Sequence, residues 1–186
     1  TEAVYLPNGI DPSFYPKRGR DLQGKIRILI EGDCSAEHKN VDESFRIVEQ
    51  LDLEKFEIWY MSYNGNPKSW YRVDRFLHRV PEVYAACDIL LKTSLLESFS
   101  YPPLEMMASG GYVVAVPNGG NLEYLKDGEN CILYPQGNLA EAKAAIERIL
   151  TDAELRKKLD TGAEETVKER NWKRIEPQIL EQYLGK

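Results

Sequence analysis

Short apolar runs alternate with amphipathic helical patterns along this chain. The apolar runs lie at residues 25–31, 56–63, 88–91, 113–116 and 131–133, and 73–80 is expected to hold a short third strand and its exit loop. Between them, apolar residues recur every three or four positions, which is typical of helices that bury one face. Strands that alternate with helices favour a parallel sheet covered on both faces. We therefore predict an α/β fold, a doubly wound, Rossmann-like parallel sheet of about six strands in the order 3-2-1-4-5-6.

Capping residues set the ends of the predicted helices. Asn40 precedes a helical pattern at 41–51, and Glu43 three positions later suggests a capping box. Two amphipathic helices are predicted at 138–150 and 152–170, with Thr151 and Glu154 capping the second. The final residues, 171–185, carry more apolar side chains than the last helix of an isolated domain needs.

The stretch from residue 88 to residue 120 forms the centre of the pattern. An apolar strand at 88–91 leads into a loop that contains Glu97, and the helix that follows begins near Pro102 and Pro103 and stops at Gly110. Glu105 lies in the first turn of that helix. Both glutamates then lie at the carboxyl end of a central strand, where open parallel sheets bind ligands. The alternative is a solvated loop glutamate and a first-turn glutamate favoured by the helix dipole.

Composition narrows the class of protein. The chain has 186 residues, of which 42% are hydrophobic and 29% charged, as in soluble globular domains. Its net charge of −6 argues against a nucleic-acid partner. The three cysteines share no metal-ligand spacing and are expected to be reduced. No stretch reads as a membrane span or a signal peptide.

The string from Glu97 to Gly111, ESFSYPPLEMMASGG, closely resembles the donor-site signature of retaining GT-B glycosyltransferases of family 4. The resemblance implies that Glu97, the catalytic candidate, lies beside the transferred sugar and that Glu105 holds the ribose hydroxyls. It further implies that backbone amides after Glu97 bind the diphosphate. The implied donor-binding residues are Gly32, Lys39, Ser98, Phe99, Ser100, Tyr101 and Glu105. No metal and no cofactor are expected, since the substrate is itself a nucleoside-diphosphate sugar.

The sequence departs from the family pattern at three positions. Ser98 and Ser100 stand where the family often has glycine, and Asp33 stands where it usually has an arginine for the diphosphate. Lys39 matches the second diphosphate cation of the family. Lys92, at the end of the central strand, is a candidate replacement for the missing arginine.

The resemblance also covers Pro7 to Asp11, which is similar to the passage by which these enzymes enter their second domain. The chain therefore looks like the C-terminal, donor-binding half of a GT-B enzyme. It divides into a hinge segment (1–24), a nucleotide-sugar-binding domain (25–170) and a C-terminal helix (171–186). In the family this helix crosses back to the first domain; the alternative is that it packs on its own sheet.

The function implied is transfer of a hexosyl group, with retention, from a nucleoside-diphosphate sugar to a glycan, lipid or other acceptor, as in polysaccharide biosynthesis. The acceptor would bind through the missing N-terminal domain. The reduced state expected of the cysteines indicates a cytoplasmic location. The alternative is peripheral association of the full-length protein with the inner face of the membrane. Two alternatives remain: a non-catalytic nucleotide-sugar-binding module, or half of a sugar-nucleotide epimerase.

Overall fold

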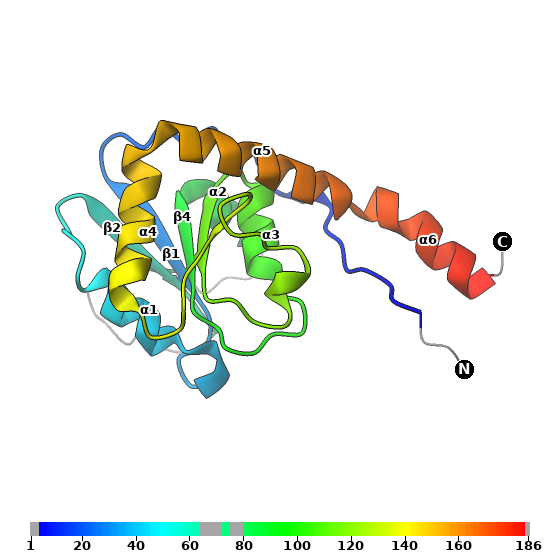
Figure 1. Cartoon of the computed structure of the whole chain (residues 1–186), viewed down its shortest axis with the longest axis horizontal. Helices are drawn as coiled ribbons and strands as arrows, with labels where there is room; N and C mark the ends of the chain where they lie inside the picture. Colours follow the sequence, from blue (N-terminus) through cyan, green and yellow to red (C-terminus); the bar gives the residue numbers. More distant parts are fainter. Residues whose placement is uncertain (1–3, 64–71, 75–79, 185–186) are drawn as a thin grey trace.

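A computed structural model describes residues 4–63, 72–74 and 80–184 (Figure 1). Its core is a six-stranded sheet in the order β3-β2-β1-β4-β5-β6, and every neighbouring pair is parallel. The predicted sheet and strand order are confirmed. The strands are β1 (Ile26–Glu31), β2 (Phe56–Met61), β3 (Arg72–Asp74), β4 (Ile89–Lys92), β5 (Tyr112–Ala115) and β6 (Ile132–Leu133).

Helices cover both faces of this sheet (Figure 1). On one face, Ile28 and Ile30 of β1 pack in a cluster with Phe45 of α1 and Ile146 of α4. On the other face, strand residues such as Leu90 pack with α2 and α3, and α5 contributes to both clusters. The helices are α1 (Val41–Val48), α2 (Val80–Ala86), α3 (Tyr101–Ala108), α4 (Leu139–Thr151), α5 (Ala153–Glu169) and α6 (Trp172–Leu184).

Successive strands are added to one side of β1 up to β3, and from β4 onward they are added to the other side. β1 pairs with β2 on one side and with β4 on the other, where Ile28 aligns with Ile89. The connection that leaves β1 and the connection that leaves β4 run in opposite directions across the sheet, so the carboxyl ends of these strands flank a crevice. This switch point lies where Glu31 and Lys92 end their strands.

Three details of the sequence-based prediction are wrong. Asn40 has left-handed backbone angles and makes no side-chain cap; its amide instead donates to the Glu43 carboxylate, so there is no capping box. The cap of α5 is Asp152, which accepts from the Leu155 amide, and not Thr151. Glu105 lies past the first turn of α3, which contains no acidic residue. The short third strand expected within 73–80 is present at 72–74; residues 75–79 lie outside the described residues, and residue 80 opens α2.

The N-terminal segment and α6 run side by side at one end of the molecule (Figure 1). Ile10 donates to the Arg170 carbonyl at 2.7 Å and accepts from the Trp172 amide at 3.0 Å. Beyond this junction α6 extends away from the sheet, and Ile175 is its one buried residue within the described chain. The alternative in which this helix packs on its own sheet therefore does not hold. Within the described residues, no helix has the length and apolar character to span a membrane.

Candidate functional site

The loop after β1 is shaped by Gly32. This residue has a φ of +142°, a backbone conformation that residues with a side chain rarely adopt. A Cβ atom there would lie 3.0 Å from Val41 Cγ2 and 3.3 Å from Lys39 Cβ. The Tyr60 hydroxyl donates to the Gly32 carbonyl at 2.9 Å and fixes the turn. The turn therefore lets Lys39, the last residue of the short 3-10 helix η2 (Glu37–Lys39), approach the end of β1 closely.

Lys39 and Glu97 meet across the switch point. The Lys39 ammonium lies 2.8 Å and 3.0 Å from the two carboxylate oxygens of Glu97. The two side chains are 24% and 13% exposed, so water screens the pair only in part. Lys39 is therefore already engaged, and a phosphate that binds it must compete with Glu97.

Lys92 lies beneath this pair. It is the last residue of β4, a strand buried throughout, and its side chain has no exposed surface. The ammonium contacts the Glu31 carboxylate and lies 3.2 Å from Glu97 Oε1. A buried ammonium needs such partners, because desolvating an unpaired charge is very costly. The sequence-based suggestion that Lys92 itself contacts the diphosphate does not fit this burial.

The two lysines keep Glu97 ionised. Burial by itself would raise the pKa of Glu97, but the charge of Lys92 and the hydrogen bond from Lys39 outweigh it. The resulting pKa lies below the ordinary value for a glutamate. A carboxylate held in this state can orient hydroxyl groups or stabilise positive charge, and it has no proton to donate at neutral pH.

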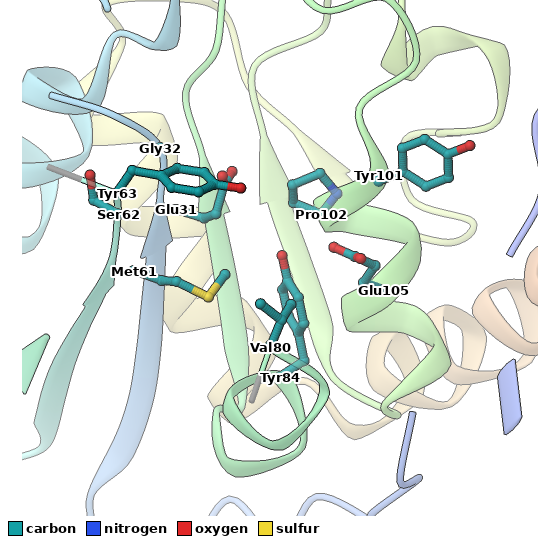
Figure 2. Close-up of a pocket in the computed structure, with 10 residues that line it drawn as sticks. All are labelled: Glu31, Gly32, Met61, Ser62, Tyr63, Val80, Tyr84, Tyr101, Pro102 and Glu105. Carbon is teal, nitrogen blue, oxygen red and sulfur yellow. The ribbon is translucent and has the colours of Figure 1, made fainter. Parts of the chain in front are cut away.

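Glu105 faces a cavity of about 260 Å³ at the carboxyl ends of β1 and β2, beside α2 and the start of α3 (Figure 2). The cavity is lined by Glu31, Gly32, Met61, Ser62, Tyr63, Val80, Tyr84, Tyr101, Pro102 and Glu105. Tyr63 and Tyr101 stand on opposite sides of it in this view. Aromatic walls around a carboxylate suit a ligand that combines a flat ring with hydroxyl groups.

Two tyrosine hydroxyls hold the Glu105 carboxylate. Tyr15, from the N-terminal segment, donates to Oε1 at 2.6 Å, and Tyr84 of α2 makes a second hydrogen bond. Burial raises the pKa of Glu105, although both hydrogen bonds lower it. Glu31 lines the same cavity and contacts Lys92, so it connects Glu105 with the Lys39–Glu97 pair.

The loop between Glu97 and α3 offers backbone more than side chains. Ser98 is exposed, but Phe99 and Ser100 are buried. The Phe99 ring packs against Tyr101, with ring centroids 5.0 Å apart, and lies under the Arg170 guanidinium. Ser100 has left-handed backbone angles, with φ at +70°. Any contribution of Phe99 and Ser100 to a ligand must therefore come from their main chain.

The structure thus brings Gly32, Lys39 and Glu97 together and places Glu105 in the adjoining cavity. Asp33 instead accepts from the amide and hydroxyl of Ser35 within its own loop. Sequence reasoning missed three residues of the site: Glu31, Tyr15 and Tyr84. Of these, only Glu31 carried a signal, as a charged residue closing an apolar strand.

A sequence model of the family "Glycosyl transferases group 1" matches residues 72–166. The O-antigen biosynthesis protein RfbC of Myxococcus xanthus is 27% identical over 99% of this chain and 15% of its own length. The MMP alpha-(1->4)-mannosyltransferase of Mycolicibacterium hassiacum is 33% identical over 96% of this chain and 47% of its own length. The chain thus spans less than half of either relative.

Among solved structures, Anabaena Alr3699/HepE in complex with UDP-glucose superposes with a TM-score of 0.82 at 19% identity. The match covers 97% of this chain and 57% of that one, and it supports the GT-B type of Rossmann-like fold. The family model covers just over half of the chain, including both glutamates and the loop between them. The chain therefore belongs to the group 1 glycosyl transferases.

Proposed function

We propose that this chain is the donor-binding part of a family 4-like retaining glycosyltransferase. It would bind a nucleoside-diphosphate hexose, whose hexosyl group is transferred to a glycan, lipid or other acceptor. The observation that carries the proposal is the Glu105 cavity beside the Lys39–Glu97 pair, at the switch point of the sheet. UDP-glucose in HepE and the mannosyltransferase activity named for the Mycolicibacterium relative support a hexose donor.

Each part of the donor has a chemically suitable partner in this arrangement. The ribose hydroxyls would bind the Glu105 carboxylate, and the base would occupy the cavity between its aromatic side chains. The diphosphate would lie over the backbone of residues 98–101 and take Lys39 as its cation. Glu97, held ionised, would orient the hydroxyls of the sugar.

The chemistry proposed is electrostatic. Cleavage of the bond between sugar and diphosphate leaves negative charge on the departing phosphate, and a positioned ammonium stabilises that charge. Lys39 would supply it from the protein, so the proposal requires no cofactor beyond the donor. The acceptor would bind to a part of the protein outside this chain, in keeping with the chain's coverage of 47% and 57% of its relatives.

Calorimetry with UDP, GDP and their glucose and mannose conjugates tests the proposal. We expect Glu105→Gln to weaken binding by roughly 1–3 kcal/mol, because a charge-assisted hydrogen bond to the ribose is lost. Glu147→Gln, in an ion pair on α4, is the matched control and should bind as the wild type does. Unchanged affinity in Glu105→Gln would remove this residue from the site.

Transfer assays on the full-length protein separate an enzyme from a non-catalytic binding module. We expect hexosyl transfer with the anomeric configuration of the donor preserved, read by nuclear magnetic resonance of the product. Binding without transfer by the full-length protein would favour the module instead.

A further inference from the structure

Four charged side chains form one row across the switch point. Glu31, Lys92, Glu97 and Lys39 follow one another with alternating sign, each contacting the next. Two positive and two negative groups leave this row without net charge. Among these four side chains, a diphosphate therefore meets no cation that is not already paired with a carboxylate. Lys39 must therefore move away from Glu97 before it can bind a phosphate.

The exposures of the two lysines show which of them can move. Lys39 is 24% exposed and comes from a short helix in a loop, whereas Lys92 is fully buried at the end of a central strand. Lys39 can turn from the Glu97 carboxylate toward a ligand, but Lys92 cannot leave its place. Glu97, only 13% exposed, would lose its nearest partner when Lys39 turns away.

Lys92 lets Glu97 remain paired with a cation when Lys39 moves away. Its ammonium lies 3.2 Å from Glu97 Oε1, so Glu97 keeps one cation when Lys39 departs. Without Lys92, a departing Lys39 would leave a largely buried carboxylate unpaired, which is strongly disfavoured. Lys39 would then stay on Glu97 and not on the phosphate.

We propose that Lys92 is a positioning residue: it anchors Glu97 and so allows Lys39 to exchange between Glu97 and the diphosphate of the donor. This inference rests on the proposed function, because it assumes that a nucleoside diphosphate binds here. It assigns the buried lysine a role through Glu97 and not through contact with the ligand. It also explains how Lys39, which is paired with Glu97 in the structure, can still supply an ammonium to the phosphate.

Three variants test the exchange: Lys92→Met, Glu97→Gln and the double variant. Calorimetry measures UDP against uridine and GDP against guanosine, so that the diphosphate contribution is isolated. Lys92→Met should weaken diphosphate binding by about tenfold, the effect of one lost charge-assisted contact, and change nucleoside binding less than about twofold. Lys143→Met, on the surface of α4, is the matched control.

The decisive result is the double variant. Glu97→Gln releases Lys39, so this change should raise diphosphate affinity by itself and restore it in the Lys92→Met background. A purely structural role for Lys92 predicts that nucleoside binding falls as well and that Glu97→Gln rescues nothing; that outcome overturns the inference.

If Lys92→Met does not fold, Glu97→Gln alone still decides, because unchanged or weaker diphosphate binding contradicts the exchange. Failure of the wild-type chain to bind either diphosphate would instead overturn the proposed function and this inference together.

Discussion

Ser100 has a side chain but adopts a backbone conformation that glycine adopts more readily. Its φ of +70° is left-handed, which costs a residue with a Cβ about 1–2 kcal/mol. Its hydroxyl is buried and has no hydrogen-bond partner among the described residues. This backbone conformation therefore lowers the stability of the fold. The contacts of the neighbouring Phe99 ring with Tyr101 and Arg170 do not relieve the strain at Ser100.

Ser100→Gly should raise the free energy of unfolding by about 1 kcal/mol, since glycine removes the strain and the unsatisfied hydroxyl together. Urea denaturation measures this change. Ser98→Gly is the control, because Ser98 is exposed and is not among the described residues with positive φ. We expect it to leave stability unchanged or to lower it slightly. Equal effects of the two substitutions would contradict the assignment of strain to Ser100.

At the scale of elements, the N-terminal segment ties two helix ends together. The Arg20 guanidinium donates to the carbonyls of Tyr84 and Ala85 in α2 and of Ser109 and Gly110 after α3. These carbonyls are among those that helices leave without partners at their C-termini. Burial lowers the pKa of Arg20 to about 10, so it remains charged at neutral pH. The same segment brings the Tyr15 hydroxyl to Glu105 in the middle of α3.

Arg20→Met should lower the free energy of unfolding by roughly 2–3 kcal/mol, because charged hydrogen bonds to four partly buried carbonyls are lost together. Thermal and urea denaturation give the value. Arg46→Met, on the exposed side of α1, should stay within about 0.5 kcal/mol of wild type. A small effect at Arg20 would mean that water replaces the guanidinium without cost.

The elements themselves were largely predictable from the sequence. The helices expected at 138–150 and 152–170 differ from α4 and α5 by about one residue at each end. The cap between them was misassigned because Thr151 and Asp152 are both good capping residues. Thr151 ends α4 and its hydroxyl donates to the Glu147 carbonyl, which leaves the cap to Asp152. Adjacent candidates of this kind are resolved only by where the preceding helix stops.

Only those site residues that lie in a recognisable local sequence pattern were predictable. Glu97, Lys39 and Glu105 followed from the family signature and from their places after strands. Tyr15 lies 90 positions from Glu105 in the chain, and no spacing rule connects them. The burial of Lys92 likewise depends on neighbouring strands that cover it, and the sequence showed only a lysine at the end of an apolar run.

For the molecule as a whole, the two site glutamates have opposite effects on stability as the pH changes. The pKa of Glu97 is lowered in the folded chain, so its stabilising contribution is present above the ordinary value of 4.5 and is lost as pH falls through its lower folded pKa. The pKa of Glu105 is raised. Its ionised form therefore costs stability above the folded pKa, and that cost is relieved as pH falls toward 4.5.

Mild acidification should therefore separate folding from binding. Between the raised pKa of Glu105 and pH 4.5, wild type should gain stability relative to Glu105→Gln, because the glutamine variant carries no buried charge to neutralise. Over the same interval, nucleotide affinity of the wild type should fall as the ribose loses an ionised acceptor, while that of Glu105→Gln stays flat. Urea denaturation and calorimetry on both proteins across this interval measure the two trends. Parallel loss of stability and affinity in the wild type would mean that Glu105 is not the titrating group, and that acidification acts on the Glu97 ion pairs instead.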